Sequence, residues 1–107
     1  MVIKRFDVFL VTLDPAVGSE IRKTRPCLVV SPNEMHRNID TVIIAPMTSK
    51  RRAYPSRVSC TFRRKANQIA LDHIRGVDKS QLIKRLGTVG ESVRREVLER
   101  LAEMFSP

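Results

Sequence analysis

Arg25-Pro26-Cys27-Leu28-Val29-Val30-Ser31-Pro32 is an apolar, β-branched run with a proline near each end. The part from Cys27 to Ser31 is too short for a helix, and Ser31-Pro32-Asn33 ends it as a turn. A second run of the same kind extends from Thr41 to Pro46. We therefore expect two buried strands in this part of the chain, the first of which starts at Pro26.

Further short strands are predicted on both sides of these two runs. Apolar and polar residues alternate between Arg57 and Phe62, which predicts a half-buried strand. The stretch from Phe6 to Leu13 predicts another, and Asp14-Pro15 ends it as a turn. Two more candidates are Gln68 to Ile74 and the short run from Leu82 to Leu86.

In the last part of the chain, the spacing of the apolar residues changes. Apolar residues recur at helical spacing from Val93 to Phe105, opposite glutamates and arginines, which predicts one amphipathic helix. Its N-cap is either Thr88, which has Glu91 three residues on as in a capping box, or Gly90. Short strands followed by a helix predict a mainly β domain, in which a curled sheet or open barrel carries the helix. The length of 107 residues fits one such domain, residues 1–107.

The charge of the chain is positive and unevenly distributed. Lysine and arginine number 20 against 11 aspartates and glutamates, a net charge of +9. Residues 21–65 hold eleven basic and two acidic side chains, while the flanking parts are close to neutral. Such clustering predicts a contiguous positive face, for which nucleic acid is the first candidate partner.

The two cysteines show no sign of a metal site. Cys27 and Cys60 lie far apart in apolar stretches, without partners at metal-ligand spacing. We expect two reduced core thiols in a cytoplasmic protein. The sequence has no Walker loop, EF-hand loop or acidic cluster, and no apolar run long enough to cross a membrane. It therefore predicts no metal, no other cofactor and no membrane partner.

Polar side chains concentrate in two irregular segments beside the predicted strands, residues 18–26 and 46–52. If the strands that begin near Cys27 and Thr41 pair, both segments emerge at one edge of the sheet. That edge would gather a carboxylate, a guanidinium and hydroxyl groups. We expect residues 16–24 to form an exposed connection.

This set of groups suits cleavage of RNA by its own 2′-hydroxyl. The guanidinium of Arg25 matches the charge of a pentacoordinate phosphorus, and Thr48 can donate to a nonbridging oxygen. Glu20 is the nearest candidate for a base or an orienting group. The alternative is that Glu20 and Arg25 form a surface ion pair and that Thr48 is an ordinary strand-end threonine.

Other polar residues have weaker signals. The runs Lys50-Arg51-Arg52 and Arg63-Arg64-Lys65 are candidates for phosphate contacts or for plain solvated loops. No local feature positions His36 or His73 as an acid or a base, so we expect both histidines at the surface.

Four blocks, in order along the chain, resemble the MazF/PemK family of endoribonuclease toxins. They are Arg5 to Val8 with the Leu13-Asp14-Pro15 turn, residues 18–20 with 23–32, residues 41–49, and residues 71–79. The resemblance covers nearly the whole chain. It implies an SH3-like, CcdB-like curled barrel with a C-terminal helix, and it implies a homodimer.

The same resemblance implies the toxin of a type II toxin-antitoxin system. Such a toxin cuts single-stranded RNA, in particular mRNA, at short sequences without a metal, and leaves a 2′,3′-cyclic phosphate and a 5′-hydroxyl. An acidic antitoxin inhibits it. Arg25 and Thr48 are the implied catalytic pair, and Glu20 matches the glutamate of the family's first loop. The expected RNA contacts are Ser19, Lys23, Ser49, Lys50, Arg51, Arg52, Asp72 and His73.

Two positions depart from the family pattern. Phe6 stands where many relatives have glycine, and His73 replaces the usual glutamine. Two other functions stay open: a noncatalytic nucleic-acid-binding barrel, and a toxin of similar fold that poisons gyrase. The motifs around Arg25 and Thr48 are those of the branch that cuts RNA, which favours the ribonuclease.

Overall fold

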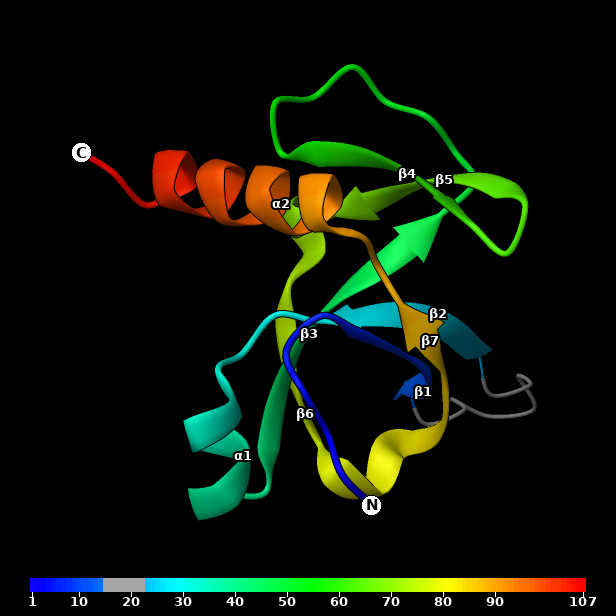
Figure 1. The fold of residues 1–107 in the computed structure, drawn as a ribbon, viewed down its shortest axis with the longest axis vertical. Helices are drawn as coiled ribbons and strands as arrows, with labels where there is room; N and C mark the ends of the chain where they lie inside the picture. Colours follow the sequence, from blue (N-terminus) through cyan, green and yellow to red (C-terminus); the bar gives the residue numbers. More distant parts are fainter. Residues whose placement is uncertain (15–22) are drawn as a thin grey trace.

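Seven antiparallel strands form one curled sheet in the described residues, 1–14 and 23–107, of this computed structural model (Figure 1). Their order is β4-β5-β3-β2-β1-β7, and β6 pairs with β3 outside this path. The strands are β1 (Asp7–Asp14), β2 (Lys23–Val29), β3 (Thr41–Thr48), β4 (Arg57–Phe62), β5 (Lys65–Ala70), β6 (Arg75–Asp78) and β7 (Leu82–Thr88). The prediction of a mainly β, curled fold is confirmed.

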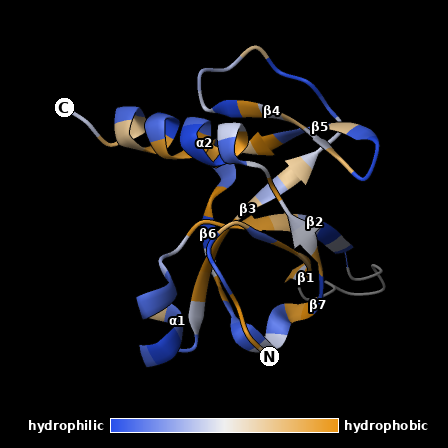
Figure 2. Ribbon diagram, in the orientation of Figure 1, coloured by the Kyte–Doolittle hydropathy of each residue, from blue (hydrophilic) through white to orange (hydrophobic). Residues whose placement is uncertain are grey.

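Strand β3 is where the sheet turns. Its first half, from Thr41 to Ile44, pairs with β6, whereas Met47 and Thr48 pair with β5. Both faces of the curled sheet are covered by apolar side chains, which explains the continuous apolar runs in the sequence. One buried cluster includes Val8, Leu28, Ala45, Met47, Ile69, Leu71 and Val97, and the other includes Phe9, Val11, Cys27, Val29, Val42, Ile44 and Val77. Figure 2 shows the hydrophobic colour along β3, while the tip between β4 and β5 is hydrophilic.

The C-terminal helix α2 (Glu91–Met104) packs on β4, as the apolar period predicts. Its N-cap is Gly90 rather than Thr88. The Thr88 hydroxyl donates to the carbonyl of Phe6 at 2.9 Å, and therefore ties β7 to the start of β1. No helix in the described ranges is long and apolar enough to cross a membrane.

Several boundaries differ from the predicted ones. Helix α1 (Asn33–Asn38) replaces the turn expected after Pro32, and β6 was not expected. The predicted strand from Gln68 to Ile74 is wrong in its second half, because Leu71–His73 forms a 3-10 turn, η1. A second such turn, η2 (Lys79–Gln81), precedes β7.

The start of β2 also differs from the prediction. Lys23 and Thr24 belong to this strand and pair with Asp14 and Thr12 of β1, so they are not loop residues and Pro26 is not the strand start. Asp14 of the predicted Asp14-Pro15 turn is the last residue of β1, whereas Pro15 and the predicted connection over residues 16–22 lie outside the described residues.

Phe6 has a backbone conformation that glycine adopts more readily. Its φ is +74°, in the left-handed region. The ring is buried in the first apolar cluster, and the Arg94 guanidinium lies 5.5 Å from its centroid. Burial of the apolar Phe6 ring thus offsets the strain of its backbone conformation.

Candidate functional site

The ladder between β2 and β3 ends where the candidate residues begin. Cys27 pairs with Pro46, Leu28 with Ala45 and Val29 with Ile44. Neither Pro26 nor Pro46 has an N–H to donate, which favours separation of the two strands at this point. The two strands pair as expected, so the described parts of the two predicted polar segments, residues 23–26 and 46–52, lie at one edge of the sheet.

Beyond this point the strands open into a cleft of about 490 Å³. Arg25 at the start of β2 and Thr48 at the end of β3 both line it, and so do Tyr54, Arg57 and His73. The other lining residues are Leu13, Lys23, Pro46, Lys50, Arg52, Ala70 and Arg75. We call this hollow the first cleft.

A second cleft, of about 590 Å³, has Arg25, Thr48 and Lys50 in common with the first. It continues along the hairpin of β4 and β5, where Phe62, Arg63, Lys65, Ala66 and Asn67 line it together with Pro26, Met47, Ser49 and Leu86. Since both clefts have these three residues in their lining, Arg25 and Thr48 lie where the clefts meet. An extended ligand bound across both clefts would pass over this pair.

The described lining of both clefts is basic. It contains lysines and arginines from β2, β4, β5, β6 and the loop after β3, and no aspartate or glutamate. Seven of the eleven basic side chains in residues 21–65 line the two clefts, in agreement with the predicted positive face. Concave, positively charged walls of this kind concentrate polyanions.

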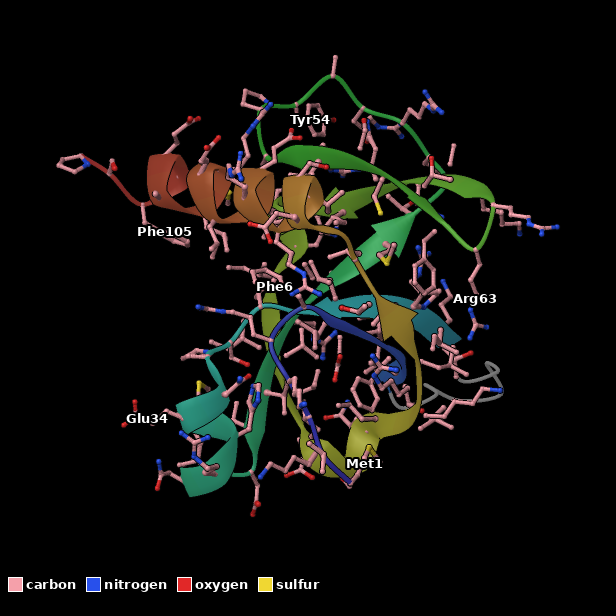
Figure 3. All side chains as sticks on the ribbon, in the orientation of Figure 1. Met1, Phe6, Glu34, Tyr54, Arg63 and Phe105 are labelled. Carbon is pink, nitrogen blue, oxygen red and sulfur yellow. The ribbon has the colours of Figure 1, made fainter. Side chains whose placement is uncertain are left out.

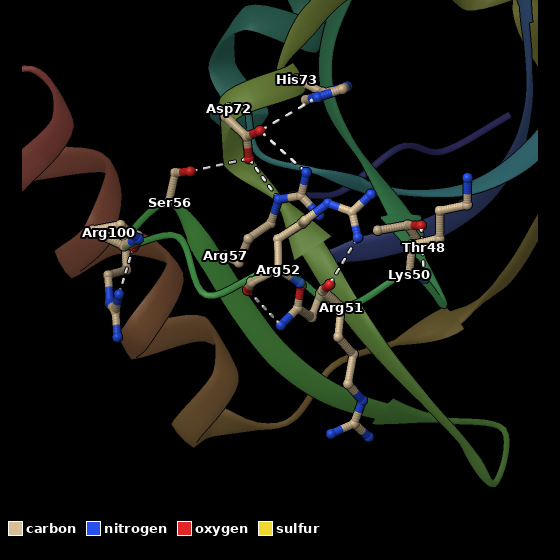
Figure 4. Close-up of polar contacts among 11 residues, drawn as sticks. Thr48, Lys50, Arg51, Arg52, Ser56, Arg57, Asp72, His73 and Arg100 are labelled. Atoms are coloured by element: carbon tan, nitrogen blue, oxygen red, sulfur yellow. Dashed lines mark hydrogen bonds and ion pairs between the residues drawn. The ribbon is translucent and has the colours of Figure 1, made fainter.

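Thr48 is held in a defined geometry by its neighbours. Its Oγ1 accepts a hydrogen bond from the Lys50 backbone N–H at 3.1 Å, so the hydroxyl hydrogen can point to a ligand (Figure 4). Gln68 of β5 pairs with Thr48 of β3. It also anchors the loop that follows β3. Its side chain accepts from the Arg52 N–H at 3.0 Å and donates to the Arg52 carbonyl at 3.2 Å. Sequence reasoning missed Gln68, because its role depends on the strand register.

Asp72 lies at the centre of a polar network beside the first cleft (Figure 4). Its carboxylate accepts from Arg57 Nε at 2.8 Å and Nη2 at 3.2 Å, and from Ser56 Oγ at 3.0 Å. The hydrogen bond from Arg57 is the main reason why the pKa of Asp72 lies below its ordinary value. His73 Nε2 is 3.3 Å from the same carboxylate, and the His73 side chain is 63% exposed.

The predicted RNA contacts occupy different positions in this arrangement. Lys23, Lys50, Arg52 and His73 line the first cleft, and Ser49 lines the second. Arg51 and Asp72 are absent from the described linings, and Asp72 is engaged by the protein's own side chains. Ser19 and Glu20 lie outside the described residues. No group of three or more potential metal-ligating side chains occurs in the described parts of the chain.

His36 is buried, so the expectation of a surface histidine is wrong for this residue. Its Nδ1 donates to the carbonyl of Ile3 at 3.0 Å, and its Nε2 lies 2.6 Å from the Ser31 hydroxyl. His36 therefore fixes the N-terminal segment against the end of β2, away from both clefts. Cys27 and Cys60 are buried, as expected for core thiols, and desolvation raises the pKa of Cys27 to about 12.

Comparisons with known proteins agree with this architecture. A family model described as PemK-like, MazF-like toxin of type II toxin-antitoxin system matches residues 4–105. The chain is 30% identical over 109 residues to endoribonuclease PemK of Escherichia coli, a match that covers 96% of this chain and 82% of that protein. It is 31% identical over 107 residues to endoribonuclease EndoA of Bacillus subtilis (strain 168), with 94% and 92% covered.

The fold also has counterparts among solved structures. A chain of the MazE-MazF (Form-II) crystal structure from Deinococcus radiodurans superposes with a TM-score of 0.84 at 24% identity, covering 97% of this chain and 96% of that chain. This last likeness concerns the fold alone.

Proposed function

Since this chain belongs to the PemK-like, MazF-like toxin family of type II toxin-antitoxin systems, we propose that it is a sequence-specific endoribonuclease. Its substrate is single-stranded RNA, and its reaction uses the RNA's own 2′-hydroxyl and needs no metal ion. The main support is the position of Arg25 and Thr48, which face the junction of two basic clefts from adjacent strands.

The proposed reaction exchanges one ester bond of the phosphate for another. The 2′-oxygen bonds to the adjacent phosphorus while its proton passes to a base, and the bond from phosphorus to the 5′-oxygen breaks. The 5′-oxygen takes up a proton and leaves as a hydroxyl, and the phosphate closes to a 2′,3′-cyclic diester. Atoms and charge balance without a cofactor.

The two central side chains act on the charge that develops at phosphorus. The Arg25 guanidinium presents planar N–H donors to the nonbridging oxygens, which are most negative in the transition state. The Thr48 hydroxyl donates a further hydrogen bond to one of these oxygens. Glu20, which precedes β2 in the sequence, is our candidate base or orienting residue.

The surrounding residues bind the rest of the strand. Lys23, Lys50, Arg52 and His73 supply contacts from the first cleft, and Ser49 from the second. We assign Ser19, Arg51 and Asp72 to RNA contacts on the family resemblance alone. An acidic antitoxin segment would find the same basic walls, and we propose that it blocks the RNA path of a cytoplasmic homodimer.

Mapping the ends of RNA fragments tests this function. The purified protein is incubated with a long single-stranded RNA in EDTA, and we expect discrete cuts that end in a 2′,3′-cyclic phosphate. Salt-sensitive binding without cuts would instead support a noncatalytic barrel. Inhibition of supercoiling without RNA cleavage would support a gyrase poison.

A further inference from the structure

We propose that the ring of Tyr54 is a stacking platform for one unpaired base of the RNA strand, next to the phosphate held by Arg25 and Thr48. This inference rests on the proposed function and adds a subsite to it. Tyr54 lines the first cleft together with both catalytic candidates. Figure 3 labels it on the loop that leads into β4.

One face of the Tyr54 ring is already supported. The Arg57 guanidinium lies 5.2 Å from the ring centroid, within the range of a cation–π contact. The Arg57 side chain is only 8% exposed, whereas Tyr54 is 49% exposed. A large, half-exposed aromatic residue with one supported face leaves the opposite face for a flat ligand.

The loop that carries Tyr54 is held in place from three directions. The Arg57 N–H donates to the Tyr54 carbonyl at 3.1 Å, which closes a turn over Pro55 and Ser56. The Leu71 N–H donates to the Ser56 carbonyl at 3.0 Å, and Arg100 of α2 donates to the Pro55 carbonyl. The ring is therefore ordered before a ligand arrives, which reduces the entropy lost on binding.

Asp72 gives this platform its second support. It binds Arg57 through two nitrogens and therefore fixes the guanidinium beneath the ring. In this subsite, and apart from the direct RNA contact proposed above, Asp72 is a positioning residue that acts through Arg57. The buried guanidinium is held by the protein's own carboxylate, so its part in this subsite is to support Tyr54.

An unpaired nucleic-acid base is the ligand that fits this surface. Bases stack on tyrosine rings independently of their identity, and the basic wall around Tyr54 attracts the phosphates on either side. A base in a duplex already stacks on its neighbours and is not free to bind the ring. The platform therefore favours single-stranded RNA over duplex RNA.

The composition of the chain makes this inference easy to test. Tyr54 is the one tyrosine and the chain has no tryptophan, so intrinsic tyrosine fluorescence reports on this ring alone. The probe is a single-stranded oligonucleotide with 2′-O-methyl ribose throughout, which has no hydroxyl for the cleavage reaction. A fully abasic oligonucleotide of the same length and charge is the control. Emission is corrected for absorption by the bases with free N-acetyltyrosinamide.

We expect the base-bearing probe to quench Tyr54 emission and the abasic probe to leave it unchanged when equally bound. Tyr54→Leu should weaken binding of the base-bearing probe about tenfold, while Tyr54→Phe keeps it within about twofold. Phe105→Leu is the matched control, because Phe105 is exposed beyond the end of α2 and lines neither cleft in the described residues (Figure 3). In cleavage, Tyr54→Leu should raise KM more than it lowers kcat.

Two results separate this subsite from the proposed function. If the protein cuts RNA but Tyr54→Leu binds and cuts as well as the parent, the stacking platform is wrong and the ribonuclease stands. If base-bearing probes quench Tyr54 but no RNA is cut, the platform stands and the ribonuclease is wrong. Equal quenching by the abasic probe would also contradict stacking.

Discussion

Arg25 and Thr48 each lie two residues beyond the Cys27–Pro46 pair that ends the β2–β3 ladder. The two residues come from segments that are far apart in the sequence, and both line the two clefts. The strands β2 and β3 themselves carry both groups. Under the proposed function, the small sheet thereby presents a guanidinium and a hydroxyl to one phosphate.

Thr48→Val tests the hydroxyl of this pair. Valine keeps the β-branched shape but removes the donor, so we expect RNA cleavage to fall by roughly 100-fold or more. Thr48→Ser should recover most of the rate, since it restores the hydroxyl. Thr61→Val on β4 is the control, because Thr61 is an exposed strand threonine that lines neither cleft in the described residues. Equal rates for Thr48→Val and Thr61→Val would remove Thr48 from the mechanism.

In the hairpin between β4 and β5, we expect the residues that favour RNA binding to lower the stability of the fold. The two-residue loop of the hairpin consists of Arg63 and Arg64, with φ of +50° and +66°. This left-handed geometry is typical of Asn-Gly and strains arginine. Arg63 nevertheless lines the second cleft and donates to the Leu86 carbonyl at 2.6 Å.

Replacing Arg63-Arg64 by Asn-Gly should raise the free energy of unfolding by about 1 kcal/mol, after allowance for the lost Leu86 contact. The same change should weaken RNA binding. It should also reduce the slope of log binding constant against log salt concentration by roughly 0.7 to 1.4. Urea denaturation and salt titration measure the two effects. The control is the double variant Arg37→Asn and Arg95→Gln, which removes the same amount of charge at positions that line neither cleft in the described residues. If this control lost as much RNA affinity, a specific role for the hairpin would be contradicted.

In the Asp72→Asn variant, the free energy of unfolding should depend less on pH in the acidic range. The folded-state pKa of Asp72 is lowered from 3.8, so its stabilising effect is complete above that value and is lost as the pH falls through the lower pKa of the folded protein. We expect the variant to lose about 1 kcal/mol at neutral pH, because water screens this partly exposed pair. The difference from the parent should shrink in urea denaturation as the pH falls below 3.8. A constant difference over this range would contradict the assignment.

The Cys27 thiol should react slowly with thiol reagents in the folded protein. Burial raises its pKa to about 12, so almost none of it is thiolate near neutral pH. With a Cys60→Ser variant, which leaves Cys27 as the one thiol, labelling by a disulfide reagent at about pH 8 should follow global unfolding. Because the raised pKa favours the thiol in the folded state, stability should fall only as the pH rises above the ordinary value of 9.0. Rapid labelling of the folded protein would show that Cys27 is accessible.

Much of the sheet could be predicted because its strands have simple patterns. The alternation over Arg57–Phe62 and the helical period of α2 each correspond to one buried face, and both predictions are confirmed. The missed elements have no such pattern. Helix α1 is a single short segment, and β6 spans four residues with Gly76 among them. Their formation depends on packing beside β3, which periodicity does not reveal.

The site was predicted to the extent that it depends on strand pairing. The pairing of β2 with β3 brings Arg25 and Thr48 together as expected. Tyr54 and Arg57 received no assignment, because their importance comes from one ring contact and one carboxylate contact across the fold. His36 was misplaced for the same kind of reason: a buried histidine differs from an exposed one only through partners such as Ile3 and Ser31.

The rate of RNA cleavage by Arg25→Ala in EDTA tests the central claim most directly. Arg37→Ala serves as the matched control, because Arg37 is an exposed arginine on α1 that lines neither cleft in the described residues. We expect the parent and Arg37→Ala to cut one RNA at the same positions and leave cyclic phosphate ends. Arg25→Ala should be folded and at least about 100-fold slower. Cleavage by Arg25→Ala at the parental rate, or cleavage by the parent that EDTA abolishes, would contradict a metal-independent site built on Arg25.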